Sequence, residues 1–140
     1  HTLLVIVVIS ITGYGYSRMH FKGRDTLFFN LLGISFIPGV VNLIPSYKIN
    51  DALGWVNTSL AMIITVLAGM GNIFLVRQFM MGVPKDLDES ARVDGAGDFR
   101  IYSSIILPLM KPVLIVCGLF SFTGSWNDFL WPVIVYTDVE

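Results

Sequence analysis

The chain has 140 residues, of which 54% are hydrophobic and only 14% are charged, and its mean hydropathy is +0.72. Ordinary soluble domains carry roughly 25% charged residues, so this composition indicates a membrane protein. The net charge of −1 and the lack of basic residues interleaved with aromatic ones argue against nucleic-acid binding. A single cysteine, Cys117, forms no internal disulfide or zinc site by itself, and the sequence shows no catalytic constellation.

Four long runs of the chain carry almost no charge. A helix that crosses the hydrocarbon core of a bilayer needs about 20 apolar residues, so each run is a candidate membrane span. The runs cover residues 2–17, 26–47, 52–76 and 112–137. Pro38 predicts a kink in the second run, and Asp128 is the one charged residue of the last. Four glycines are expected to let helices pack closely: Gly13, Gly15, Gly69 and Gly71.

These runs predict the fold class, an all-α membrane protein built as a polytopic transmembrane helix bundle. Helices buried in a soluble protein are the alternative for any one run, but four runs in one short chain argue against it. The sequence begins at His1, without an initiator Met or the charged start of a signal peptide. We therefore expect a segment of a longer polypeptide, one domain or less.

The basic residues predict how the spans are oriented. Lys and Arg concentrate on the cytoplasmic side of membrane proteins. Eight of the nine fall in the first and third loops between runs: Arg18, Lys22, Arg24, Arg77, Lys85, Arg92, Arg100 and Lys111. Only Lys48 falls in the second loop. The first and third loops are therefore expected in the cytoplasm, with Asp51 and Asp138 on the opposite side.

The third loop, within residues 84–112, contains the pattern of a short helix. Pro84 suits the first helical position. Acidic residues crowd the first turns, where they complement the helix dipole: Asp86, Asp88 and Glu89. Leu87, Ala91 and Val93 predict a short apolar face, and Gly95 and Gly97 are expected to end the helix.

A second helix is predicted after these glycines. Asp98 is expected to cap the sequence FRIYSSIIL, which Pro108 ends or kinks near the membrane. The segment is either a solvated cytoplasmic loop or a rigid helix–turn–helix that docks with a partner. The ordered capping signals favour the second interpretation.

One motif in this segment resembles that of a known family. Glu89-Ser90-Ala91, then Gly95, then Ile105 and Leu107-Pro108, resembles the EAA motif of the transmembrane subunits of type I ABC importers. Ser90 stands where that motif has a second alanine, a change of one small residue for another. The sequences FLVRQFMMGVPKDLDESARVDGAGDFRIYSSIILPLMKP and FTGSWNDFLWPVIV are similar to permeases of the sugar-importing branch, such as those of the maltose system.

The resemblance implies a role for the charged segment. It implies that residues 1–140 are part of one ABC transmembrane domain, about helices two to five of six, and that residues 84–108 are its coupling loop. In the family this loop docks in a cleft of a cytoplasmic ATPase subunit, which binds the ATP and Mg²⁺. The residues carried over to ATPase coupling are Glu89, Ser90, Ala91, Asp94, Gly95, Ile105, Leu107 and Pro108.

The resemblance also implies the partners and the location. The expected partners are ATPase subunits, a second permease subunit in a heterodimer, a periplasmic or lipid-anchored solute-binding protein and membrane lipid, with no nucleic acid. The chain itself is expected to hold no cofactor, no metal and no catalytic residue, because the partner subunit hydrolyses ATP. The expected location is a bacterial or archaeal inner membrane, which the chain crosses several times.

Asn127 and Asp128 form a second candidate site. An ionisable residue within a span is by default a functional candidate, but Asp128 lies roughly 24 Å along the helix from Pro112, close to the outer interface. Trp126 and Trp131 flank it as interfacial aromatics do. Either Asp128 anchors the interface, or it lies near the translocation path or the binding-protein contact.

Three classes of function differ in the residues that they require, and the sequence favours the first. An ATP-driven importer permease, for a sugar or for an amino acid, peptide or phosphate, explains the charged loop. A membrane enzyme would need paired acids, an activated nucleophile or a metal cluster. A secondary transporter or channel would more often carry buried charges along a path and has no use for a docking helix.

Overall fold

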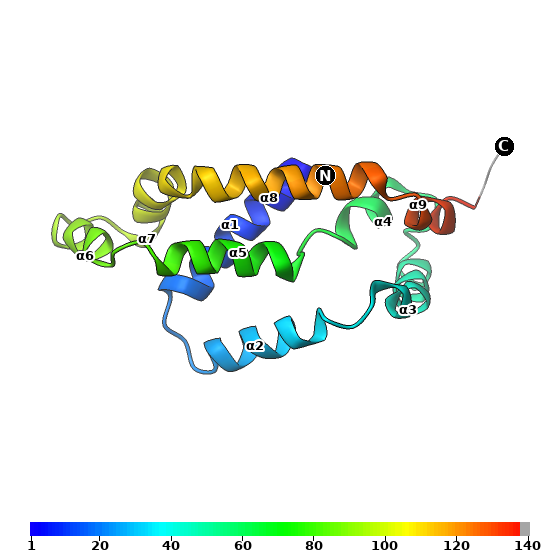
Figure 1. Cartoon of the computed structure of the whole chain (residues 1–140), viewed down its shortest axis with the longest axis horizontal. Helices are drawn as coiled ribbons and strands as arrows, with labels where there is room; N and C mark the ends of the chain where they lie inside the picture. The colour runs from blue at the N-terminus through cyan, green and yellow to red at the C-terminus, as the bar shows by residue number, and fades with distance from the viewer. Residues whose placement is uncertain (138–140) are drawn as a thin grey trace.

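The computed structural model describes residues 1–137, which form helices and no strands (Figure 1); Asp138 lies outside the described residues. The helices are α1 (Thr2–Arg18), α2 (Arg24–Ile34), α3 (Gly39–Ala52), α4 (Ser59–Ile64), α5 (Met70–Met81), α6 (Asp86–Val93), α7 (Asp98–Ile101), α8 (Leu107–Asn127) and α9 (Leu130–Val135). A π-helical turn, η1 (Tyr102–Ile106), joins α7 to α8. The all-α prediction is therefore confirmed.

The main core lies where α1, α5 and α8 pack against one another. Gly13 on α1 allows the closest approach, because a Cβ built there would lie 2.3 Å from Val76 Cγ1 on α5. On α8, a Cβ at Gly118 would lie 3.1 Å from Ile6 Cδ1. The packing role predicted for Gly13 is confirmed, whereas Gly69 and Gly71 meet no neighbouring helix. Buried core residues include Val5, Ile9, Val76, Met80, Ile106, Met110 and Cys117.

A smaller core lies at the opposite end of the molecule from α6. There α9 packs against α4 and α3, and Ala61, Trp131 and Val135 are buried together. The Trp131 indole Nε1–H donates a hydrogen bond to the Ala61 carbonyl oxygen at 3.2 Å. This bond fixes the short helix after Asp128 onto the chain that leads to α5.

Helix α2 is attached mainly at its first turn. Arg77 on α5 is buried, and its Nη2 donates to Asp25 Oδ1 at 2.6 Å. The Arg77 guanidinium also lies 4.0 Å from the centroid of the buried Phe28 ring, a favourable cation–π geometry. The remainder of α2 exposes large apolar side chains such as Phe29 and Ile34.

The four predicted spans take a more broken form than expected. One helix, Asp98–Asn127, is long and apolar enough to cross a membrane, and α2 with α3 would add a second span if that pair, bent by 102°, crosses as one. The bend follows from Pro38, which disfavours helical geometry at the residue before it. The prediction of one helix over 52–76 is wrong, because this run divides into α4 and α5 at a turn that ends at Gly69. The run 112–137 likewise breaks at Asp128.

The chain passes back and forth along the long axis of the molecule. Figure 1 shows α1 and α5 running toward the end that carries α6, and α2 and α8 running away from it. The loop before α2 and the segment α6–α7 consequently lie toward one end, and α3, α4 and α9 toward the other. This arrangement agrees with the grouping of loops that the basic residues predicted.

Candidate functional site

Helix α6 forms the outermost part of one end of the molecule (Figure 1). Its first turn holds Asp86, Asp88 and Glu89, whose charges favour the positive end of the helix dipole. Lys85 is the N-cap, and its carbonyl oxygen accepts hydrogen bonds from the backbone N–H of Asp88 and Glu89 at 2.9 and 3.1 Å. Pro84 therefore lies before the helix rather than at its first position, which corrects the sequence prediction.

Gly95 makes the turn that ends α6. Its φ of +81° lies in the left-handed region, where a residue with a Cβ is strained. The Ala96 N–H donates to the Ala91 carbonyl at 2.9 Å, and the Gly95 N–H donates to the Arg92 carbonyl at 3.0 Å. These two bonds form a Schellman motif. Gly97, at φ −76° and ψ 164°, is extended and precedes α7, so only Gly95 ends the helix as predicted.

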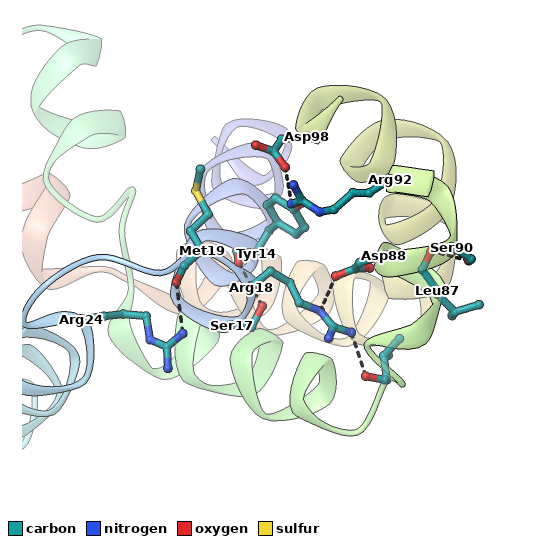
Figure 2. Close-up of polar contacts among 11 residues, drawn as sticks. Tyr14, Ser17, Arg18, Met19, Arg24, Leu87, Asp88, Ser90, Arg92 and Asp98 are labelled. Carbon is teal, nitrogen blue, oxygen red and sulfur yellow. Dashed lines mark hydrogen bonds and ion pairs between the residues drawn. The ribbon is translucent and has the colours of Figure 1, made fainter. Parts of the chain in front are cut away.

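The inner face of α6 contains Asp88 and Ala91, its two buried residues. Asp88 Oδ2 lies 3.2 Å from Nε of Arg18, the last residue of α1. Arg18 Nη2 also donates to the Val83 carbonyl oxygen at 2.8 Å, in the chain between α5 and α6. Figure 2 shows the Arg18 guanidinium reaching from α1 to the Asp88 carboxylate.

The outer face of α6 is exposed and mixes charge with apolar surface. Val93 is 88% exposed and Leu87 40% exposed, so only Ala91 of the predicted apolar face is buried. The reason is that Asp88 and Ala91, three residues apart, share the inner side of the helix, and Arg18 neutralises the aspartate there. The motif residues Glu89, Ser90, Asp94 and Gly95 are exposed on this helix and its turn.

A second ion pair closes the turn from outside. Arg92 on α6 pairs with Asp98 on α7 (Figure 2). Both side chains are more than half exposed, so the pair contributes about 0–1 kcal/mol. Gly97 is the N-cap residue and Asp98 makes no side-chain cap, which overturns the capping role predicted for Asp98.

The remaining motif residues lie on the neighbouring helix. Ile105 is in η1, Leu107 begins α8, and both pack against the main core, while Pro108 is exposed. The helix continues through Pro108, so this proline does not end it, and a kink there stays a prediction. Pro108 stands just after the π-helical turn, at the start of α8, where the ring fits the altered hydrogen-bond register.

Two contacts that attach this end to α1 could not be predicted from the sequence. The Tyr102 hydroxyl on η1 lies 2.8 Å from Ser10 Oγ, and the rings of Tyr102 and Tyr14 lie 5.3 Å apart. From the sequence, Arg18 counts only among the basic residues that predict a cytoplasmic loop. The sequence does contain one indication: the basic residues place the first and third loops on the same side of the membrane. Arg18 is then expected on the same side as the acidic first turn of α6.

The second candidate site lies at the other end of α8. Asp128 lines two adjoining hollows, of about 470 and 430 Å³. Asn127, Asn72 and Ser121 line the first hollow, and Asn42 lines the second. Asp128 Oδ1 also accepts a hydrogen bond from the Trp131 backbone N–H at 3.3 Å. The Asp128 carboxylate therefore accepts a hydrogen bond in the turn into α9 and borders both hollows. Its role at the interface or near the translocation path stays a prediction.

Comparison with known proteins gives one family and several relatives. The family model described as binding-protein-dependent transport system inner membrane component matches residues 3–139. The arabinooligosaccharides transport system permease protein of Bacillus subtilis (strain 168) is 35% identical over 139 residues, covering 99% of this chain and 50% of that protein. The trehalose/maltose transport system permease protein of Thermococcus litoralis is 33% identical, covering 98% and 50%. The chain thus spans about half the length of the curated relatives it matches.

A solved structure gives the same fold. A bacterial ABC transporter involved in the import of the acidic polysaccharide alginate superimposes with a TM-score of 0.85 at 23% sequence identity, covering 97% of this chain and 48% of that chain. The two chains therefore share a fold over nearly the whole length of this chain.

Proposed function

The chain belongs to the family of binding-protein-dependent transport system inner membrane components, and from that premise we propose that it is part of the permease subunit of an ATP-driven importer for sugars or oligosaccharides. The observation that carries the proposal is the match of nearly the whole chain to relatives named as permeases for arabinooligosaccharides and for trehalose and maltose. The family membership confirms the resemblance drawn from the motif in residues 84–108.

The proposed subunit crosses the inner membrane several times. The apolar helix Asp98–Asn127 is one crossing, and α1, the bent pair α2–α3 and the broken pair α4–α5 supply the others. Their alternating direction and the basic residues at the α6 end support this arrangement. The exposed apolar side chains on α2 and α8 then face lipid or a second permease subunit.

Helix α6 with the Gly95 turn is the proposed docking surface for the ATPase subunit. It protrudes from the bundle, and its exposed face offers an acidic group, Glu89, beside the apolar side chain of Val93. Phe99 on α7 is a further exposed apolar side chain, at 80%. A carboxylate that docks in a cleft needs a basic partner there, so the complementary cleft should contain one. ATP and Mg²⁺ then act in the partner, and this chain supplies no catalytic residue.

The hollows beside Asp128 form the proposed outer part of the sugar path. Sugars are recognised through their hydroxyl groups, which donate and accept hydrogen bonds. The amides of Asn72 and Asn127 and the hydroxyl of Ser121 can also do both, and the Asp128 carboxylate accepts hydrogen bonds. The same end is the proposed contact for a periplasmic or lipid-anchored solute-binding protein.

Transport measurements test the proposal. The full-length permease would be reconstituted in vesicles with its ATPase, its second permease subunit and its binding protein, and uptake of labelled arabino- and malto-oligosaccharides measured. We expect uptake that requires both ATP and the binding protein. Uptake driven by an ion gradient without ATP would favour a secondary transporter, and ATP-driven uptake of amino acids, peptides or phosphate alone would refute the sugar assignment.

A further inference from the structure

Arg18 connects the end of α1 to two points of the segment that leads into α6. Its Nε lies 3.2 Å from Asp88 Oδ2, and its Nη2 donates to the Val83 carbonyl oxygen at 2.8 Å. Val83 precedes α6, and Asp88 lies in its first turn. One guanidinium therefore holds both the approach to the helix and the helix itself (Figure 2).

This contact is protected from water. The side chains of Arg18 and Asp88 are only 6% and 12% exposed. A buried charge that loses its partner is strongly unfavourable, so α6 cannot move away from α1 while the two groups stay buried. Arg18 Nε and Asp88 Oδ1 make no hydrogen bond among the described residues, so the contact at Nε is an ion pair without hydrogen-bond geometry.

Little else attaches α6 to the bundle. Asp88 and Ala91 are its buried residues, and Ala91 offers only a methyl group to the main core. The Arg92–Asp98 pair joins α6 to α7 and not to α1. Arg18 is thus the side chain of α1 that holds α6 by a buried ion pair and holds the chain before α6 by a hydrogen bond.

We propose that Arg18 is a positioning residue, which sets the angle of α6 and carries its displacement to α1. The proposal rests on the proposed function of α6 as the ATPase-docking helix. Arginine suits this role because its planar guanidinium can bind a carboxylate and a carbonyl at once, which a lysine ammonium on a single stem does less well.

The test is a double-mutant cycle in the complete transporter, with Arg18→Gln, Asp88→Asn and the double variant. Lys22→Gln, an exposed residue of the same loop, is the matched control. Three quantities are measured: permease in the membrane, ATPase subunit retained on purification, and sugar transported per ATP hydrolysed. The third quantity separates positioning from a merely structural role.

We expect each single variant to retain the ATPase subunit but to transport about tenfold less sugar per ATP, because one charge is left buried without its partner. The double variant should recover to within about threefold of wild type, and Arg18→Lys should lie between wild type and Arg18→Gln. Additive losses in the double variant, or parallel loss of permease, ATPase subunit and uptake, would overturn the proposal. Failure of the wild-type transporter to use ATP would instead overturn the proposed function.

Discussion

The turn after α6 offers a sharp test, because two glycines two residues apart differ in backbone conformation. Gly95 has φ +81°, whereas Gly97 has φ −76° and ψ 164°. A Cβ at either position would meet nothing within 4 Å. Gly95→Ala therefore introduces backbone strain without a steric clash, at a cost of about 1–2 kcal/mol. Gly97→Ala introduces neither and should change the energy by less than about 0.5 kcal/mol.

The strain should appear as lost affinity for the ATPase subunit. The free turn can relax by unwinding, but docking in the native shape restores the strained conformation. An energy of 1–2 kcal/mol corresponds to a roughly five- to thirtyfold higher Kd, and Gly95→Val should raise it at least as far. The assay is titration of the full-length permease in lipid nanodiscs with purified ATPase subunit. Equal affinities for Gly95→Ala and Gly97→Ala would refute the claim that this turn shapes the docking surface.

Two further changes test the core and the charge on α6. Gly13→Ala should destabilise the bundle by about 1–3 kcal/mol, because the new methyl group would clash with Val76. The effect is measured as a lower Tm in detergent, with Gly33→Ala, which meets no neighbour, as the control. An equal Tm for the two variants would contradict the packing of α1 against α5. Glu89→Lys should reduce the ATPase subunit retained on purification while leaving insertion unchanged, and Lys48→Ala at the other end should change neither; full retention with Glu89→Lys would exclude a docking role for this carboxylate.

The helical class and the grouping of loops could be predicted because they depend on local composition. The apolar runs and the positions of Lys and Arg are read directly from the sequence. They predict spans and their orientation without any knowledge of which helices pack together. The Gly95 turn was equally accessible, since glycine is the usual residue where φ must be positive after a helix.

The helix breaks and the inner face of α6 could not be predicted in the same way. Hydropathy does not distinguish a continuous span from α4 and α5 joined by a turn, because both are apolar throughout. Of the predicted apolar face of Leu87, Ala91 and Val93, only Ala91 is buried, and the other buried residue of α6 is Asp88. The burial of Asp88 depends on its ion pair with Arg18, seventy positions away in the chain. Only the folded arrangement of α1 and α6 brings these two side chains together.

Crosslinking from the outer face of α6 tests the central claim, that this helix docks on an ATPase subunit. A photoreactive residue would replace Val93, which is 88% exposed, and in separate variants Ala91, which is 8% exposed, and Lys48 at the opposite end. The full-length permease would be irradiated with purified ATPase subunit, with and without ATP. The account predicts a crosslink from position 93 whose yield changes with ATP, and none from positions 91 and 48. A crosslink from position 48, or none from position 93 while the subunits copurify, would contradict it.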